Sequence, residues 1–373
     1  MNNMVYLDHN ATTTIYPAVK SKMDEYAFMN LNPSSIHASG RIAKSLIENA
    51  RTNIMQLIGC QSTDRNYKVT FTSSGTEANN LIISNYLTEA EIFISAVEHL
   101  SLFTYAKLYS NVTIIAVDSN GLVDLDDLKT KLSECQNKTK LVSVMLANNE
   151  TGIIQPIEEI SNIAKTCGAL IHSDCAQAIG KIDVNIVKLG LDFITISGHK
   201  FGGPVGAAAL IHRSDIHLKP LLLGGGQEQG LRAGTENVLA LIGLGAAAVI
   251  ALKSIKEYCY TVQKLRDKIE DELVKHFDNI KIVGKNVQRL PNTILFINPD
   301  KTAETQLIGL DMQGVEVSSG SACSSGKVGK SHVLSAMGYT ESDVRSAIRI
   351  SLGITNTEDE IEQFLAIYND LNK

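Results

Sequence analysis

The sequence lacks an uncharged apolar run long enough to span a membrane, which takes about 18 residues or more. Its most apolar stretch, Val238–Leu252, is shorter and rich in alanine and glycine, which is more typical of a buried helix. The N-terminus has neither the basic region nor the apolar stretch of a secretory signal. We therefore expect a cytoplasmic protein that has no membrane partner.

The sequence also has fewer basic than acidic residues. The 34 Lys and Arg residues are outnumbered by 40 Asp and Glu, which gives a formal net charge of −6. Direct nucleic-acid binding is not expected, because the neutralisation of phosphates takes a surplus of Lys and Arg. With 373 residues, of which 44% are hydrophobic, the chain can build one large α/β domain and a smaller one.

Cysteine is sparse, and its spacing shows no pairing pattern. The sequence has six, at Cys60, Cys135, Cys167, Cys175, Cys259 and Cys323. No two form a Cys-x-x-Cys pair, which argues against a disulfide framework, a thioredoxin-like pair and a structural zinc site, so no metal is expected. A small buried hydrophobic residue is the ordinary role of a cysteine, and only Cys323 needs another explanation.

Short β-branched runs alternate with helical patterns through the first two-thirds of the chain. Strands are expected at Lys68–Thr72, Ile92–Ala96, Val112–Val117, Leu141–Ala147, Ala169–Ser173, Leu191–Ser197 and Ala207–His212. Helices are expected between them, for example at Glu77–Leu87 and Ile157–Cys167. The strands are apolar throughout, as when helices cover both faces of a sheet. The predicted fold is α/β, with a doubly wound, mostly parallel seven-stranded sheet and helices on both faces.

The pattern changes after residue 250. A long helix is expected at Glu257–His276, followed by a strand at Thr293–Ile297, a Ser/Gly-rich loop and a final helix near Glu358–Leu371. We interpret this part as a smaller α+β C-terminal domain. The predicted division places residues 15–256 in the large domain, and residues 1–14 and 257–373 in the small one.

Polar residues follow several of the predicted strands. They are Thr76, His99, Asn149, Asp174, Gln177, Ser197, His199 and Lys200. Ligands of open α/β sheets bind beyond the carboxyl ends of the strands, so these side chains should meet at one edge of the sheet. Each alone has an ordinary explanation as a turn or cap residue, but the whole set indicates a binding site.

The residues at this edge suit pyridoxal phosphate. That cofactor needs a lysine for a Schiff base, a carboxylate beside its pyridine nitrogen and donors for its phosphate. Lys200 and Asp174 supply the first two. Ser74 and Glu77 form a capping-box pattern, so a helix should begin there, and its free N–H groups with the Thr76 hydroxyl suit a phosphate. A simple helix cap explains the same pattern.

A rival motif is Gly243-Leu-Gly245-Ala-Ala-Ala248, which matches the dinucleotide fingerprint G-x-G-x-x-[GA]. It lies inside a long helical run instead of at a turn from strand to helix. Close helix packing at small residues is therefore the better interpretation, and a nicotinamide-dependent dehydrogenase is a poor alternative.

Eight segments match a known family in their order along the chain. They are Tyr6–Thr13 (YLDHNATT), Asn32–His37 (NPSSIH), Thr72–Glu77 (TSSGTE), Asn148–Gly152 (NNETG), Ser197–Lys200 (SGHK), Arg232–Thr235 (RAGT), Ser318–Cys323 (SSGSAC) and Ile348–Gly353 (IRISLG). In these, and over nearly its whole length, the chain resembles cysteine desulfurases of the NifS/IscS type. Those belong to the class-V branch of the fold-type-I pyridoxal-phosphate enzymes.

The resemblance implies roles for the predicted site residues. Lys200 would form the Schiff base with the cofactor, and Asp174 would bind the pyridine nitrogen. Gln177 would bond the phenolic oxygen, while His99 would stack on the ring and give or take protons.

The resemblance also implies a phosphate site and a substrate site. The phosphate would be held by Gly75, Thr76, Ser197 and His199, with Thr235 contributed by the other subunit of a homodimer. Asn149 would contact both cofactor and substrate. Arg349 would bind the substrate carboxylate, ideally as a bidentate pair, with help from Asn32.

Cys323 lies in a Ser/Gly-rich segment, Ser318–Ser331, which is unlike the surroundings of a core cysteine. By the resemblance, its thiolate would attack the sulfur of cofactor-bound cysteine, and an exposed loop would present the persulfide to an acceptor.

The expected activity is that of a cysteine desulfurase, which converts L-cysteine to L-alanine and provides sulfur for iron–sulfur cluster assembly or thiolation. The expected acceptor is an iron–sulfur scaffold protein or a tRNA-thiolation enzyme. One alternative is a selenocysteine lyase or another class-V enzyme on the same fold. Another is a non-catalytic sulfur-relay or scaffold protein, against which the intact set of Lys200, Asp174, Gln177 and Cys323 argues.

Overall fold

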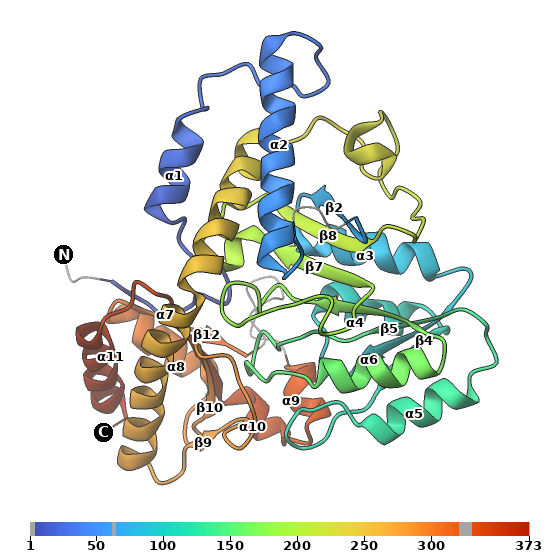
Figure 1. Ribbon diagram of the computed structural model, residues 1–373. Helices are drawn as coiled ribbons and strands as arrows, with labels where there is room; N and C mark the ends of the chain where they lie inside the picture. The colour runs from blue at the N-terminus through green and yellow to red at the C-terminus, as the bar shows by residue number, and fades with distance from the viewer. Residues whose placement is uncertain (1–3, 62–64, 321–329, 373) are drawn as a thin grey trace.

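The computed structural model describes residues 4–61, 65–320 and 330–372 (Figure 1). Its centre is a seven-stranded sheet of order β2-β8-β7-β6-β5-β3-β4. The strands are β2 (Tyr67–Thr72), β3 (Glu91–Ser95), β4 (Val112–Ile115), β5 (Lys140–Ser143), β6 (Leu170–Asp174), β7 (Phe193–Ser197) and β8 (Ala208–Arg213). β8 is antiparallel to both its neighbours, and the other neighbouring pairs are parallel. The predicted mostly parallel sheet is confirmed, although β5 ends at Ser143 and not at Ala147.

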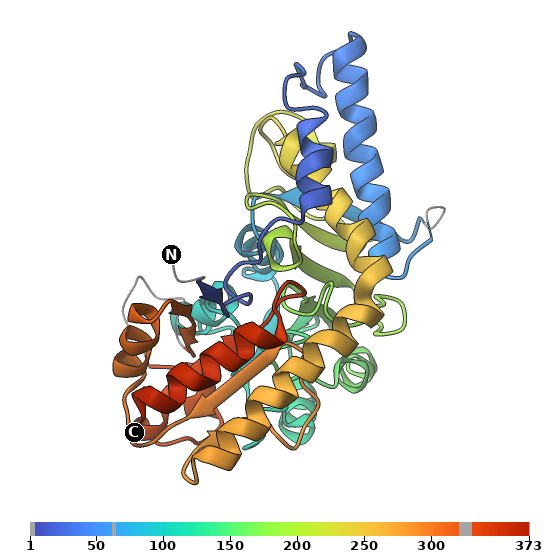
Figure 2. The ribbon, with the colours of Figure 1, turned by 90° about the vertical axis from the view of Figure 1, so that its left-hand side faces the viewer.

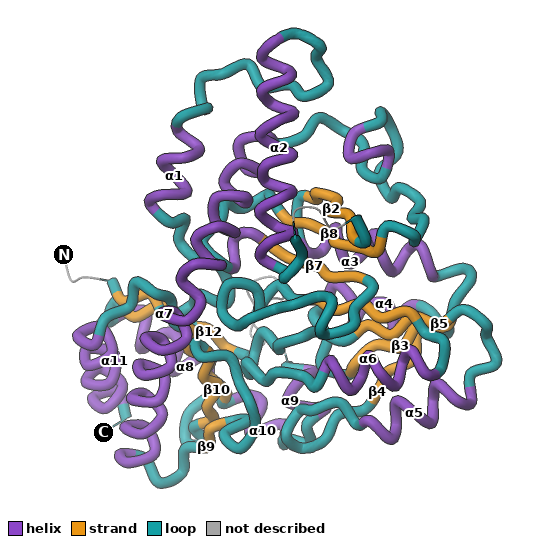
Figure 3. The backbone as a smooth tube through the Cα atoms, in the orientation of Figure 1, coloured by secondary structure: helices purple, strands orange, loops and turns teal. Residues whose placement is uncertain are grey.

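Helices cover both faces of the sheet (Figure 3). They are α3 (Gly75–Tyr86) and α4 (Leu100–Leu108) on one face, and α2 (Ala38–Leu57), α5 (Leu125–Glu134), α6 (Ile157–Thr166) and α7 (Val238–His276) on the other. In β7, Phe193 packs with the core under α3 and α4, whereas Ile194 and Ile196 pack with the core on the opposite face. Both faces of this strand are buried, and its residues are apolar or, at Thr195 and Ser197, small and uncharged.

α7 is one continuous helix of 39 residues. The sequence predicted two helical stretches, at Val238–Leu252 and Glu257–His276, and this separation is wrong. The four residues between them include no proline or glycine that would end a helix. The first half of α7 packs against α2, and the second half lies beside α11 (Glu358–Leu371) in the smaller part of the molecule (Figure 2).

Two glycines let α7 approach its neighbours closely. A Cβ added to Gly245 would lie 2.7 Å from Cα of Ala50 in α2, and one added to Gly243 would lie 2.9 Å from Pro204. The packing interpretation of the G-x-G-x-x-A motif is thus confirmed.

By length and composition, α7 is also the one helix in the described part of the chain that could cross a membrane. Of its most apolar window, 56% is buried inside the protein, as in the core helix of a globular fold. The cytoplasmic location stays a prediction.

The C-terminal part of the chain forms a smaller domain, as predicted. Its sheet has the order β12-β13-β10-β9 and is antiparallel. Its elements are β9 (Lys281–Ile282), β10 (Thr293–Ile297), α8 (Ala303–Met312), β11 (Val315–Glu316), β12 (Ser318–Ser319), α9 (His332–Ala336), α10 (Glu341–Arg345), β13 (Ala347–Ser351) and α11. β1 (Val5–Tyr6) pairs in parallel with β11, so the N-terminal segment joins this part. The domain limits, residues 1–14 and 257–373, stay a prediction.

Five of the six cysteines lie within the described ranges. Cys60 and Cys175 are buried, whereas Cys135, Cys167 and Cys259 are only partly buried. Burial raises the pKa of the Cys175 thiol, which keeps this side chain protonated and unreactive.

Candidate active site

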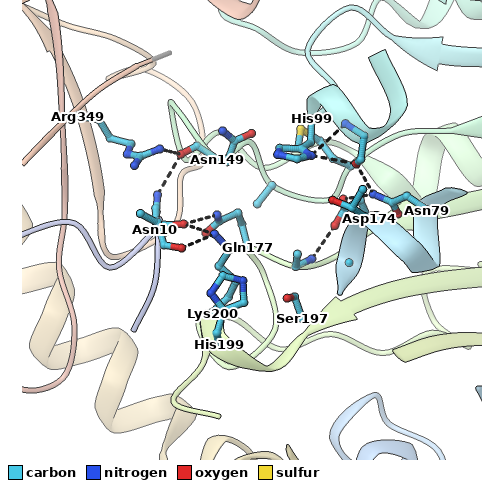
Figure 4. A pocket seen from close by; sticks show the side chains of 17 residues that line it. Asn10, Asn79, His99, Asn149, Asp174, Gln177, Ser197, His199, Lys200 and Arg349 are labelled. Carbon is cyan, nitrogen blue, oxygen red and sulfur yellow. Dashed lines mark hydrogen bonds between the residues drawn. The ribbon is translucent and has the colours of Figure 1, made fainter. Parts of the chain in front are cut away.

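A cavity of about 260 Å³ opens at the carboxyl edge of the central sheet (Figure 4). Many of its lining residues were predicted from the sequence: Gly75, Thr76, His99, Asn149, Asp174, Gln177, Ser197, His199, Lys200 and Arg349. Others, among them Asn10, Ala11, Asn79 and Ser101, were not predicted. The parallel strands end at one edge, which is why residues far apart in the sequence meet here.

Lys200 is the last residue of a short 3-10 helix, η1 (Gly198–Lys200), that directly follows β7. Its Nζ donates hydrogen bonds to the main-chain carbonyl oxygens of Asn10 at 2.6 Å and of Ala11 at 2.8 Å. Both acceptors lie on the segment that follows β1. The lysine amine therefore lies where the N-terminal segment passes the edge of the sheet.

Asp174 is the last residue of β6 and is 6% exposed. Its Oδ2 accepts a hydrogen bond from Asn79 Nδ2 at 2.7 Å, and its Oδ1 accepts one from the N–H of Ala176 at 2.9 Å. Asn79 also donates to Ser101 Oγ at 2.9 Å. Two donors on different elements thus hold the carboxylate at the cavity wall.

His99 directly precedes α4 and caps it, because its Nδ1 accepts a hydrogen bond from the N–H of Ser101 at 3.2 Å. A ring nitrogen that accepts carries no proton, so the neutral ring holds its proton on Nε2. Burial lowers the pKa of His99, Asp174 opposes this effect and Lys200 adds to it. The neutral ring is therefore the main form near neutral pH.

The start of α3 lies against the end of β7. Ser74 caps this helix, with its Oγ accepting from the N–H of Glu77 at 3.1 Å. A Cβ added to Gly75 would lie 3.6 Å from Cβ of Ser197, which shows how closely the two elements meet. Gly75 and Thr76 line the cavity, and the N–H groups of a first helical turn have no acceptor within the helix. This corner of the cavity is suited to an anion.

The predicted capping box is only half formed. The Glu77 carboxylate does not return to the N–H of Ser74; it accepts from the N–H of Ser73 at 2.9 Å and pairs with Arg232 at 2.9 Å. A charged partner is the stronger competitor for a carboxylate. Glu77 thereby ties the segment Arg232–Thr235 to the start of α3.

His199 lies beside Lys200 in η1, and its Nδ1 is 3.2 Å from Thr12 Oγ1. Burial lowers its pKa, and with the positive charges of Lys200 and Lys181 the value falls to about 4. The ring is therefore neutral at pH 7 and has one donor and one acceptor.

Arg349 lies on β13 and is 2% exposed. Its Nη2 pairs with Asp8 Oδ1 at 2.6 Å, and its Nη1 donates to the carbonyl oxygen of Asn149 at 3.1 Å. Its Nε is buried without a hydrogen-bond partner within the described structure. A guanidinium that lines a cavity suits a carboxylate ligand.

Three predicted residues are not found at this cavity. Asn32 is exposed in the loop between α1 (Pro17–Asp24) and α2, where its Oδ1 accepts from the N–H of Ser34 at 3.0 Å. Thr235 is also exposed and does not line the cavity of its own chain. Cys323 lies outside the described residues.

The sequence analysis missed Asn79 and Asn10. Asn79 lies four residues after Gly75 on α3, and this spacing puts both on one face, a signal that could have indicated it. Asn10 lies in the matching segment Tyr6–Thr13, but no local pattern gave it a role. It is 1% exposed, and its partners, among them Lys200 and Thr293, are far away in the sequence.

Comparisons with known proteins agree with this geometry. The model of the Aminotransferase class-V family matches residues 5–364. A cysteine desulfurase IscS of Dictyoglomus turgidum is 40% identical over 98% of this chain and 94% of its own. A cysteine desulfurase of Nostoc sp. is 38% identical over 99% of this chain and 93% of its own.

A crystal structure of a NifS-like protein from Rickettsia africae matches with a TM-score of 0.95 and 46% identity, over 99% of both chains. The fold-type-I architecture expected from the sequence is thus confirmed. By sequence and structure together, the chain belongs to the class-V aminotransferase family, among the cysteine desulfurases of the NifS/IscS type.

Proposed function

We propose that the protein is a pyridoxal-phosphate-dependent cysteine desulfurase, which converts L-cysteine to L-alanine and passes the sulfur to an acceptor protein. The observation that carries this proposal is the meeting of Lys200, Asp174 and the first turn of α3 around one cavity, with Arg349 at its wall. Membership of the NifS/IscS group points to the same activity.

The residues of the cavity fit pyridoxal phosphate. Lys200 offers an amine for the aldehyde carbon, and Asp174 offers a carboxylate for the pyridine nitrogen. The free N–H groups at Gly75 and Thr76 suit the phosphate, and Ser197, buried beside them, adds a hydroxyl. The donors and acceptors thus match three chemically different parts of one cofactor.

When bound, the cofactor supplies an electron sink for the pair left on the substrate α-carbon. Lys200 Nζ takes the proton from that carbon and later returns a proton to the product. Arg349, whose side chain lines the cavity, binds the substrate carboxylate and so orients the α-carbon. His99 holds a proton on Nε2 and exchanges it with the departing sulfur.

Cys323 receives the sulfur in this proposal. Its thiolate attacks the sulfur of the substrate, so a sulfur–sulfur bond forms as the carbon–sulfur bond breaks, and the carbon side keeps the electron pair. Protonation of that carbon completes L-alanine, while Cys323 retains the extra sulfur as a persulfide. An iron–sulfur scaffold protein or a tRNA-thiolation enzyme then takes this sulfur from Cys323.

We also propose that the active unit is a homodimer. The loop between α1 and α2 exposes Phe28 by 100% and Ile36 by 92%, and the segment before α7 exposes Leu223 by 85%. Exposed apolar side chains that lie together mark an interaction surface, and Leu223 follows two further exposed leucines, Leu221 and Leu222. Thr235 follows Leu223 on the same segment and would bind the phosphate in the cavity of the partner subunit. Sedimentation equilibrium should give a mass about twice the 40.4 kDa of the chain.

The deciding experiment incubates the cofactor-loaded protein with L-cysteine and a thiol, and quantifies alanine and sulfide. Lys200→Ala should abolish both products, and undiminished activity would overturn the cofactor assignment. Cys323→Ala should abolish them as well, and unchanged production would overturn the persulfide step. A selenocysteine lyase would form alanine from selenocysteine and not from cysteine. A sulfur-relay protein would form alanine from neither.

A further inference from the structure

Lys181 is a buried lysine that the proposed mechanism does not use. It is 2% exposed. Gly180, directly before it, has a φ of +76°, and a Cβ at this position would lie 2.7 Å from Cβ of Phe201. Glycine is needed there because its φ is positive and because a side chain would collide with Phe201. The turn that carries Lys181 therefore packs against the residue that follows Lys200.

The Lys181 amine binds two side-chain amide oxygens. Its Nζ donates to Gln177 Oε1 at 2.7 Å and to Asn10 Oδ1 at 2.9 Å. Burial lowers the pKa of Lys181 well below its usual value, and the positive charges of Lys200 and Arg349 lower it further. A charged amine has three hydrogens and a neutral one has two, so either protonation state can donate both bonds.

This amine and the carbonyl oxygen of Asn10 together determine which way the Gln177 amide points. Because the Lys181 amine is a donor, it needs the amide oxygen of Gln177, Oε1, to face it. The amide nitrogen, Nε2, must then point away from Lys181. Nε2 uses one of its two hydrogens to donate a hydrogen bond to the carbonyl oxygen of Asn10 at 3.0 Å. The second hydrogen is left for a ligand in the cavity that Gln177 lines (Figure 4).

Asn10 Oδ1 accepts from the same amine and from Asn292 Nδ2 at 3.0 Å. With Oδ1 directed to Lys181, its Nδ2 donates to the carbonyl oxygen of Asn149 at 3.2 Å and to Thr293 Oγ1 at 2.9 Å. Its own carbonyl oxygen accepts from Lys200 Nζ at 2.6 Å. Lys181 is thus one of several groups that hold Asn10, the residue whose carbonyl oxygen accepts from Gln177 Nε2.

We propose that Lys181 is a positioning residue, which fixes the Gln177 amide so that the cavity meets an N–H donor and not a carbonyl oxygen. The inference rests on the proposed function, because the ligand that would use this donor is the anionic phenolic oxygen of pyridoxal phosphate. Without Lys181 the amide keeps only the bond from Nε2 to the Asn10 carbonyl oxygen, and an amide that turned over would present its oxygen, which repels that anion. Lys181 itself does not line the cavity and acts through Gln177.

The test is a double-mutant cycle that measures cofactor binding. Apoprotein of the wild type, Lys181→Met, Gln177→Ala and the double variant is titrated with pyridoxal phosphate, and the Kd and the absorption maximum of the bound form are recorded. Lys181→Met should weaken binding about tenfold, the effect of one hydrogen bond to a charged oxygen. In the Gln177→Ala background the further loss should stay below about twofold. The absorption maximum should shift alike in both single variants.

Lys188→Met is the matched control, because Lys188 is exposed and does not line the cavity, and it should bind as the wild type does. If Lys181→Met does not fold, as judged by circular dichroism, Lys181→Gln takes its place under the same criteria.

An equal loss of affinity in both backgrounds, or no loss at all, would overturn the assignment of Lys181 alone. A shift of the absorption maximum that differs between Lys181→Met and Gln177→Ala would also overturn the assignment of Lys181. Failure of the wild-type apoprotein to take up the cofactor would overturn the proposed function, and this inference with it.

Discussion

Ser331 donates a hydrogen bond of 2.6 Å from its Oγ to Oε2 of Glu150, across 181 positions of the sequence. Both residues are buried. A Cβ added to Gly320 would lie 3.0 Å from the same carboxylate oxygen. The described residues on either side of 321–329 therefore both approach Glu150, which directly follows Asn149 of the cavity wall.

The titration of Glu150 should make stability depend on pH. Burial raises the pKa of its carboxyl group from 4.5 to about 7, although Ser331 and Arg349 act in the opposite direction. Between these values the folded state binds more protons at this site than the unfolded state, so this group makes the protein less stable as the pH rises. Glu150→Gln should therefore gain stability relative to the wild type between about pH 5 and about pH 8, by up to about 3 kcal/mol.

Urea unfolding of both proteins at the two pH values measures this gain. The control is Glu158→Gln at an exposed glutamate of α6, which should stay close to the wild type at both. A stability difference between Glu150→Gln and the wild type that is independent of pH would contradict the expectation.

Asn79→Ala should lower activity, because it removes the donor to Asp174 Oδ2 and leaves only the main-chain bond to Oδ1. The loss of one hydrogen bond to a charged group corresponds to a fall in kcat/KM of about 10- to 100-fold. Alanine production from L-cysteine measures it. Asn85→Ala, farther along the same helix and away from the cavity, is the control and should leave kcat/KM unchanged. Equal activity in the two variants would show that Asp174 does not depend on Asn79.

Arg349→Lys should raise KM for L-cysteine at least about tenfold and change kcat less. Lysine keeps the positive charge but cannot pair with a carboxylate through two N–H groups. Initial rates over a range of cysteine concentrations separate the two constants. Arg345→Lys is the matched control, since its side chain is 65% exposed in a pair with Glu341. A variant that loses kcat at constant KM would place Arg349 outside substrate binding.

Gly245→Ala should destabilise the fold by about 1–3 kcal/mol, because the added Cβ meets Cα of Ala50, a main-chain atom that cannot move aside locally. Gly226→Ala is the control. Its φ is −82° and nothing lies within 4 Å of an added Cβ, so stability should be unchanged or slightly higher. Thermal unfolding measures the midpoint of each variant, and the midpoint of Gly245→Ala should be the lower one. Equal midpoints would refute the packing argument.

Much of the fold and of the cavity could be predicted from local patterns. Strands such as β7 are buried on both faces and hold no charged residue, and such uncharged, β-branched runs are easy to locate. Asp174 and Lys200 follow such strands, and a parallel sheet brings their ends together whatever the details of packing. The capping box failed as a prediction because Arg232, 155 positions away, competes for Glu77.

The sequence by itself thus determined the sheet and which side chains meet at its edge, and it predicts the chemical kind of site there, because periodicity and strand ends are local properties. Only the tertiary structure decided how those groups are held. Asn10, Lys181 and Glu150 act through contacts with residues far along the chain, and the continuity of α7 is supported by packing on two separate cores. Such contacts depend on how the elements pack in three dimensions, which no local pattern encodes.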